Sequence, residues 1–183
     1  MQTEVIMSGF GGQGLMMIGK LLASAALEEG KNVTWLPSYG PEMRGGTANC
    51  TVVIGDKPVG SPLITSPWAA IVMNQPSLEK FAPMLRKDGI LVVNSTMIPI
   101  NSDRTDIRCF RIRADDLASE MGNRRSANLV MLGAYIGLEE IVSHKTLITA
   151  IEHAFAEKKK FIDVNRKTFT KGYELAKAGK SDD

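Results

Sequence analysis

Hydrophobic residues along the chain gather in short apolar runs, and amphipathic stretches separate these runs. The runs are rich in Val, Ile and Thr, as buried strands are. They predict strands at residues 4–7, 32–36, 47–54, 69–73, 90–93 and 107–112. Apolar positions that recur every three or four residues predict helices at residues 15–29, 77–86, 126–138, 145–159 and 161–178. Strands and helices therefore alternate through most of the chain, and helices alone complete it.

This order of elements predicts an α/β fold. We expect one Rossmann-like three-layer domain over residues 1–183, with a mostly parallel sheet and a helical C-terminal third. One connection breaks the alternation, because only residues 37–46 separate the second predicted strand from the third. A parallel crossover needs roughly a dozen residues or more. These two strands are therefore expected to pair antiparallel and to make the sheet mixed.

The charges of the chain are nearly balanced, with 22 Lys and Arg against 20 Asp and Glu and a formal net charge of +2. Proteins that neutralise the phosphates of DNA are usually more basic, so nucleic acid is not an expected partner. The N-terminus lacks a basic region followed by an apolar stretch, and no run of about 18 apolar residues occurs. A cytoplasmic protein without membrane contact is expected.

Cys50 and Cys109 are the two cysteines of the chain. An iron–sulfur cluster takes about four cysteine ligands, so an electron carrier is expected on another chain. Both cysteines lie in apolar, strand-like stretches, where we expect them to fill the core. His144 and His153 are not four residues apart, and no metal or hydrolytic site is predicted around them.

A glycine-rich turn follows the first predicted strand. Its residues are Gly9, Phe10, Gly11, Gly12, Gln13 and Gly14, and its glycines fit the pattern G-x-G-x-x-G directly before a helix. Such a turn can present backbone N–H groups to a phosphate at the helix N-terminus. It can equally serve only to bring helix, sheet or a partner chain close together. A dinucleotide's ribose needs an acid after the second strand, where Pro37 and Ser38 stand, so NAD and FAD are disfavoured.

A second loop, between the two strands expected to pair antiparallel, is unusually rich in side chains that can bind a ligand or a partner. Its candidate site residues are Ser38, Tyr39, Glu42, Arg44, Gly45 and Gly46. Arg and Tyr are typical interface anchors, and the loop is too polar to be a core segment. We therefore interpret this loop as a binding or interface loop in preference to a purely structural turn.

Together, residues 9–14 and 38–46 resemble the gamma subunit of 2-oxoacid:ferredoxin oxidoreductases, and the pair is more specific than either segment. The resemblance continues through residues 47–50, Ala127, Asn128, Gly133 and residues 165–173, and so spans nearly the whole chain. One departure is Pro67-Trp68-Ala69, where many members of this family carry Pro-Asp before the fourth strand. A role for that acid does not carry over to this sequence.

The resemblance implies a complex that oxidatively decarboxylates a 2-oxoacid on thiamine diphosphate, passes electrons through iron–sulfur clusters to ferredoxin and releases an acyl-CoA. It implies alpha, beta and ferredoxin-like delta subunits that hold those cofactors. This chain would not be catalytic alone, and would accommodate the CoA co-substrate with its phosphates at the amides of residues 11–14. Arg44 could supply a charge for CoA or for an acid of a partner, with Glu42 orienting it and Tyr39 stacking nearby. Loop resemblance favours 2-oxoglutarate or a branched-chain 2-oxoacid over pyruvate.

Two alternatives stay open. The chain could be a stand-alone nucleotide-dependent dehydrogenase domain that uses residues 9–14, or a scaffold subunit whose loops only contact partners. The arginines of residues 104–125 alternate with aspartates, and we interpret them as a mixed solvated surface. The lysines of residues 158–160 are interpreted as a solvated helix end.

Overall fold

The computed structural model describes residues 2–38, 47–61 and 63–182. In these residues one sheet has the strand order β2-β3-β1-β4-β5-β6. The strands are β1 (Gln2–Phe10), β2 (Asn32–Ser38), β3 (Thr47–Gly55), β4 (Ala69–Val72), β5 (Ile90–Asn94) and β6 (Arg108–Ile112). β1, β4, β5 and β6 run parallel, whereas β3 is antiparallel to both β1 and β2. The antiparallel pairing predicted from the short connection is confirmed.

The helices follow the predicted order with one addition. They are α1 (Leu15–Glu28), α2 (Gln75–Phe81), α3 (Ala114–Glu120), α4 (Ala127–Leu138), α5 (His144–Ala154) and α6 (Ile162–Lys177). Short 3-10 turns are η2 (Ala82–Met84), η3 (Arg124–Ser126) and η4 (Ala156–Phe161). The helix predicted at residues 145–159 ends earlier, at Ala154, because the backbone leaves the helical conformation at Phe155, and η4 then leads the chain into α6. α3 is the addition.

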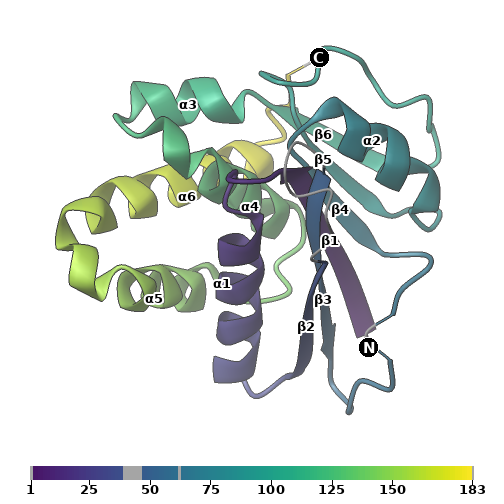
Figure 1. Ribbon diagram of the computed structural model, residues 1–183, viewed down its shortest axis with the longest axis horizontal. Coiled ribbons are helices and arrows are strands. Elements are labelled where there is room, and N and C mark those ends of the chain that lie inside the picture. Colours follow the sequence, from purple (N-terminus) through teal and green to yellow (C-terminus); the bar gives the residue numbers. More distant parts are fainter. Residues whose placement is uncertain (1, 39–46, 62, 183) are drawn as a thin grey trace.

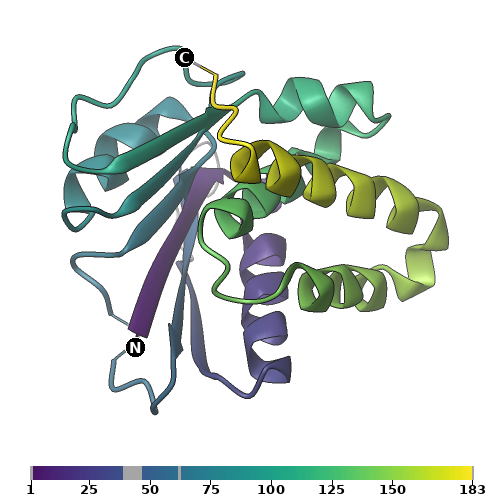
Figure 2. The ribbon, with the colours of Figure 1, turned by 180° about the vertical axis from the view of Figure 1, so that it is seen from behind.

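The helices cover the two faces of the sheet unequally (Figure 1). On one face, α1 packs on β2 and β3 while α4 packs on β5 and β4. α5 lies against α1 and α6 against α4, so the C-terminal helices form a second tier that reaches away from the sheet (Figure 2). α2 packs on β4 and β1 from the opposite face. The predicted three-layer α/β fold with a helical C-terminal third is confirmed.

Burial follows the position of each strand in the sheet. Every residue of β4 and β5 is buried, as expected for parallel strands with helices on both faces. Cys50 of β3 is buried beneath α1, and this burial raises the pKa of its thiol to about 12. The prediction that Cys109 also fills the core is wrong, because β6 is an edge strand and the Cys109 side chain is exposed. Within the described part of the chain, no helix has the length and apolar character needed to cross a membrane.

Candidate functional site

The glycine-rich turn stands at the carboxyl end of β1, as the sequence predicts. Gly9 and Phe10 still belong to the strand, so the turn proper consists of residues 11–14. Gly12 and Gly14 have φ angles of 90° and 76°, in the left-handed region that glycine adopts without steric cost. The strand therefore passes into α1 through a turn that needs glycine at two positions.

Gln13 fixes the shape of this turn. Its side-chain Oε1 accepts a hydrogen bond from the Phe10 N–H at 2.6 Å, and its Nε2 donates to the Met73 carbonyl at 3.4 Å. The Gln13 N–H donates to the Phe10 carbonyl at 3.2 Å. The N–H groups of the turn's three glycines have no acceptor among the described residues. Because unpaired backbone donors favour an anion at such a position, these amides are the first element of the candidate site.

The flanks of the second loop lie at the same edge of the sheet. β2 ends at Ser38, which is exposed and pairs with Asn49. β3 begins at Thr47, which pairs with Phe10 immediately before the glycine-rich turn. The predicted site residues Tyr39, Glu42, Arg44, Gly45 and Gly46 lie outside the described residues. The two ends of this loop therefore lie on β3, next to β1 and its glycine-rich turn, and on β2, one strand farther away.

A pocket of about 530 Å³ opens beside the glycine-rich turn. Gly12 and Gly14 line it together with η3, the start of α4, and residues of η4 and α6. Its lining includes the cations Arg124, Arg125 and Lys158, and no carboxylate from the described residues. Four further pockets, with volumes from about 270 to about 690 Å³, each have at least one carboxylate in their lining. The charge of this glycine-turn pocket therefore favours an anionic ligand.

A buried amide joins the glycine-rich turn to α4. Asn128 is 1% exposed, and its Nδ2 donates to the Gly14 carbonyl at 3.0 Å. Its Oδ1 accepts from the Leu129 N–H at 2.9 Å, so both ends of the amide are paired. This contact holds the start of α4 against the turn across 114 positions of sequence.

A second buried amide joins α6 to the same place. Asn165 is 2% exposed, and its Oδ1 accepts a hydrogen bond from the Ser126 hydroxyl at 2.6 Å. The Ser126 oxygen in turn accepts from Asn123 Nδ2 at 2.7 Å. The Ser126 side chain makes no capping bond to α4, although Ser is a common N-cap residue, and instead binds α6. Three chain segments are thus hydrogen-bonded around one wall of the pocket.

Sequence reasoning missed the basic side of this pocket. The charge pattern around Arg124, Arg125 and Lys158 indicates solvated surface, yet the fold brings all three beside the glycine-rich turn. The pattern of charges in the sequence around these residues does not show that the fold brings them close to a distant segment of the chain. The available signal was the resemblance at Asn128 and Asn165, the two amides that hold the pocket together.

The sheet order bears on the dehydrogenase alternative. In the dinucleotide-binding arrangement, the second strand runs parallel beside the first and its end carries the ribose-binding acid. Here β3 lies antiparallel beside β1, and β2 is displaced to the edge of the sheet. The end of β2 is therefore not next to the glycine-rich turn, which further disfavours NAD or FAD.

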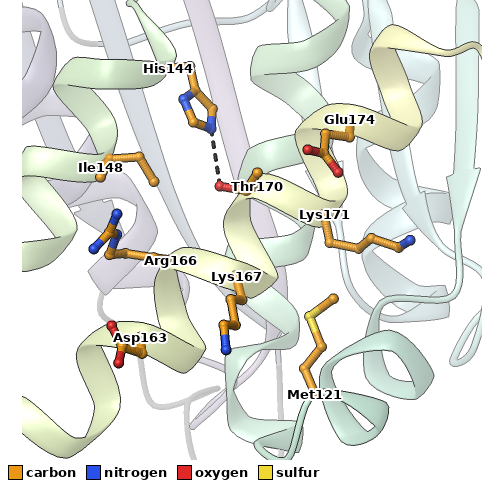
Figure 3. A pocket seen from close by; sticks show the side chains of 9 residues that line it. All are labelled: Met121, His144, Ile148, Asp163, Arg166, Lys167, Thr170, Lys171 and Glu174. Atoms are coloured by element: carbon orange, nitrogen blue, oxygen red, sulfur yellow. Dashed lines mark hydrogen bonds between the residues drawn. The ribbon is translucent and has the colours of Figure 1, made fainter.

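A different pocket, of about 470 Å³, lies between α5 and α6 (Figure 3). His144 stacks on Phe169 with ring centroids 5.3 Å apart, and its Nε2 lies 3.2 Å from the Thr170 hydroxyl. Burial lowers the pKa of the His144 imidazole. The charged residues of the lining are Asp163, Arg166, Lys167, Lys171 and Glu174. Because these cations and carboxylates are mixed, this pocket has no clear preference for an anion.

The described residues contain no group of three or more His, Cys, Asp or Glu placed to hold a metal ion.

Comparison with known proteins identifies the family. The model of the pyruvate ferredoxin/flavodoxin oxidoreductase family matches residues 4–175. The chain is 33% identical to the 2-oxoglutarate synthase subunit KorC of Methanocaldococcus jannaschii, over 97% of this chain and 95% of KorC. It is 38% identical to the ketoisovalerate oxidoreductase subunit VorA of Methanothermobacter thermautotrophicus, over 96% of this chain. Among solved structures, the gamma subunit of a keto/oxoacid ferredoxin oxidoreductase from Geobacter sulfurreducens matches with a TM-score of 0.87 and 32% identity, over 97% of this chain and 98% of that one.

This chain belongs to the pyruvate ferredoxin/flavodoxin oxidoreductase family. Within it, the chain corresponds to the gamma subunit, and the resemblance found in the sequence is confirmed. The chain spans only 37% of the length of VorA, so a longer polypeptide in that relative contains a region like this one.

Proposed function

We propose that this chain serves in a complex that oxidatively decarboxylates a 2-oxoacid to an acyl-CoA, and that it forms the CoA-binding side of that complex. The observation that carries the proposal is the glycine-turn pocket, which combines unpaired backbone amides with three cations and no carboxylate among its described lining residues. CoA is an anion with a pyrophosphate and a further phosphate. Its charge therefore suits a wall of hydrogen-bond donors at a helix N-terminus.

The chemistry of the oxidation requires groups that we assign to partner chains. Thiamine diphosphate and iron–sulfur clusters are expected on alpha, beta and delta subunits, with ferredoxin as the electron acceptor. Two cysteines are fewer than the roughly four ligands of a cluster, which supports this division. The part of the present chain is to bind and orient CoA, and to contact its partners through the loop of residues 39–46.

The 2-oxoacid is proposed to be 2-oxoglutarate or a branched-chain 2-oxoacid. Relatives named for ketoisovalerate and for 2-oxoglutarate, at 38% and 33% identity, support this preference only by a small margin over a pyruvate synthase subunit at 31% identity. A purification of the native complex would test it, by measuring which 2-oxoacid reduces ferredoxin in the presence of CoA.

The role in CoA binding is tested with the assembled complex and the substitution Arg44→Ala. We expect the KM for CoA to rise by about tenfold, as for loss of a charged hydrogen bond, while the KM for the 2-oxoacid stays unchanged. Lys57→Ala is the matched control, since Lys57 is an exposed cation beyond the far end of β3. A pure scaffold subunit predicts the same CoA affinity in both variants, and that result, together with unchanged CoA affinity in variants of the glycine-turn pocket, would refute the proposal.

A further inference from the structure

The Asp115 carboxylate is held by two different elements. Its Oδ2 accepts a hydrogen bond from Asn94 Nδ2 at 2.6 Å, and Asn94 is fully buried at the end of β5. Its Oδ1 lies 3.3 Å from Arg124 Nε. The Asp115 side chain is 13% exposed, so this carboxylate is fixed to the edge of the sheet rather than moving in solvent. The arginine that it contacts is therefore tied to the fold.

Arg124 uses only part of its hydrogen-bonding capacity in this contact. A guanidinium group has five N–H donors, and Arg124 engages its Nε with Asp115. The two terminal nitrogens have no partner among the described residues. The side chain is 68% exposed and lines the glycine-turn pocket, whereas Asp115 does not line it. The pair thus presents a forked donor to the pocket and keeps the carboxylate behind it.

Stability alone does not account for this arrangement. An ion pair with so exposed an arginine contributes little to folding, because water screens the charges. An arginine that must bind an anion gains from being fixed beforehand, since a mobile side chain loses rotamer entropy on binding. The contact with Asp115 restricts Arg124 before any ligand arrives.

The opposite wall of the pocket adds a second donor without a partner. Asn165 is 2% exposed and lines the pocket, and its Oδ1 is occupied by the Ser126 hydroxyl. Its Nδ2 donates to no described residue. Asn165 Nδ2 is not among the buried side-chain atoms that lack a partner, so it is open to the pocket and can donate to a ligand oxygen there. Donors therefore face the pocket from both η3 and α6.

We propose that Asp115 is a positioning residue, which holds Arg124 as the phosphate-binding arginine of the glycine-turn pocket. The inference deepens the proposed function and rests on it, because it names which side chain receives a CoA phosphate and what orients that side chain. Asn94 supports the same chain of contacts from the end of β5. Asp115 acts only through Arg124 and does not touch the ligand.

The test uses the assembled complex with Asp115→Ala, Arg124→Ala and the double variant. We expect each single substitution to raise the KM for CoA by roughly 5- to 10-fold, with kcat and the KM for the 2-oxoacid unchanged. The double variant should resemble Arg124→Ala, because two residues that act through one contact are not additive. Asp116→Ala is the matched control, since Asp116 lies in the same turn of α3 but pairs with Arg113 at 2.8 Å.

Activity with 3′-dephospho-CoA identifies the phosphate concerned. If Arg124→Ala weakens CoA but not dephospho-CoA, the arginine binds the 3′-phosphate; if it weakens both, the arginine binds the pyrophosphate. Either result supports the inference. The inference is wrong if Asp115→Ala matches Asp116→Ala, or if Arg124→Ala leaves the KM for CoA unchanged.

Two comparisons keep the outcome interpretable. If the complex with Asp115→Ala fails to assemble, the inference is decided by Arg124→Gln. Arg124 is exposed, and replacing it leaves the hydrogen bond between Asn94 and Asp115 in place. If Arg44→Ala weakens CoA while the Arg124 variants do not, only the present inference fails. If none of these variants alters CoA binding, the proposed function fails with it.

Discussion

Gly133 of α4 lies directly against the Phe169 carbonyl of α6, so closely that a β-carbon on Gly133 would overlap that oxygen. The contact is reciprocal, since a β-carbon on Gly172 of α6 would overlap the Val130 carbonyl of α4. Two glycines thus let the helix backbones touch. This close approach brings Asn165 of α6 to within hydrogen-bond distance of Ser126 at the start of α4.

Replacing Gly133 by Ala should therefore destabilise the protein. The added methyl group meets backbone on the neighbouring helix, which cannot rotate away, so we expect a loss of about 3 kcal/mol in the free energy of unfolding. Urea denaturation measures this loss. Gly60→Ala is the control, because no atom lies within 4 Å of its added β-carbon. Equal stability of the two variants would mean that α4 and α6 are farther apart than described.

The Glu4 carboxylate depends on Arg86 for its charge partner. The Glu4 side chain is 8% exposed and forms an ion pair with Arg86, whose side chain is 41% exposed and lies over the Trp68 ring. Arg86→Met removes the charge partner of a nearly buried carboxylate and leaves it the hydrogen bond from Gln2 Nε2, at an expected cost of about 2 kcal/mol. Glu4→Gln in the same chain should recover most of this loss. A double-mutant cycle by urea denaturation checks both values, and additive losses would show that the two residues are not coupled.

The two cysteines should differ in reactivity. Burial raises the pKa of the Cys50 thiol to about 12, so little thiolate is present near pH 8, whereas the Cys109 side chain is exposed. We expect iodoacetamide to modify Cys109 in the native protein and Cys50 only after unfolding. Mass spectrometry of peptides from native and urea-treated protein measures this. Equal labelling of both cysteines in the native protein would contradict the burial of Cys50.

The His144 imidazole should make stability depend on pH. Burial lowers its pKa in the folded protein, while the unfolded chain has the ordinary value of about 6.5. Between these two values the unfolded chain binds more protons, so stability is fully present above about pH 6.5 and is lost as the pH falls towards the folded pKa. Between about pH 7.5 and 5.5, the melting temperature of the His144→Gln variant should fall by less than that of the wild type. His153→Gln, at an exposed position, should retain the wild-type loss.

The repeating pattern of apolar residues was sufficient to predict the strands and most of the helices. The buried runs of β4 and β5 have no polar interruption, and the ten-residue connection at residues 37–46 required antiparallel pairing. α3 was missed because its 7 residues make only about two turns, too short for the apolar positions Ala114, Leu117 and Ala118 to stand out as a helical period. The error at Cys109 arose because sequence does not reveal which strand lies at the edge.

The candidate site was only half predictable. Residues 11–14 carry a local signal, since glycines at this spacing between a strand and a helix are typical of a turn that exposes backbone amides. Arg124 and Lys158 carry no local signal of a binding site. They lie more than 100 positions from the glycine-rich turn in sequence, and only the fold brings them beside it. The binding or interface roles of Tyr39, Glu42 and Arg44 in the second loop remain predictions.

The hydrogen bond from Asn128 to Gly14 joins the last third of the chain to its first strand-and-turn unit. During synthesis, a nascent polypeptide that has emerged only as far as β6 contains every strand of the sheet but still lacks the wall supplied by α4 and α6. If this chain binds CoA as proposed, its affinity for CoA should therefore appear only after α4 and α6 have packed beside the glycine-rich turn. A chain truncated before α6 would contain every strand of the sheet but lack one wall of the proposed site.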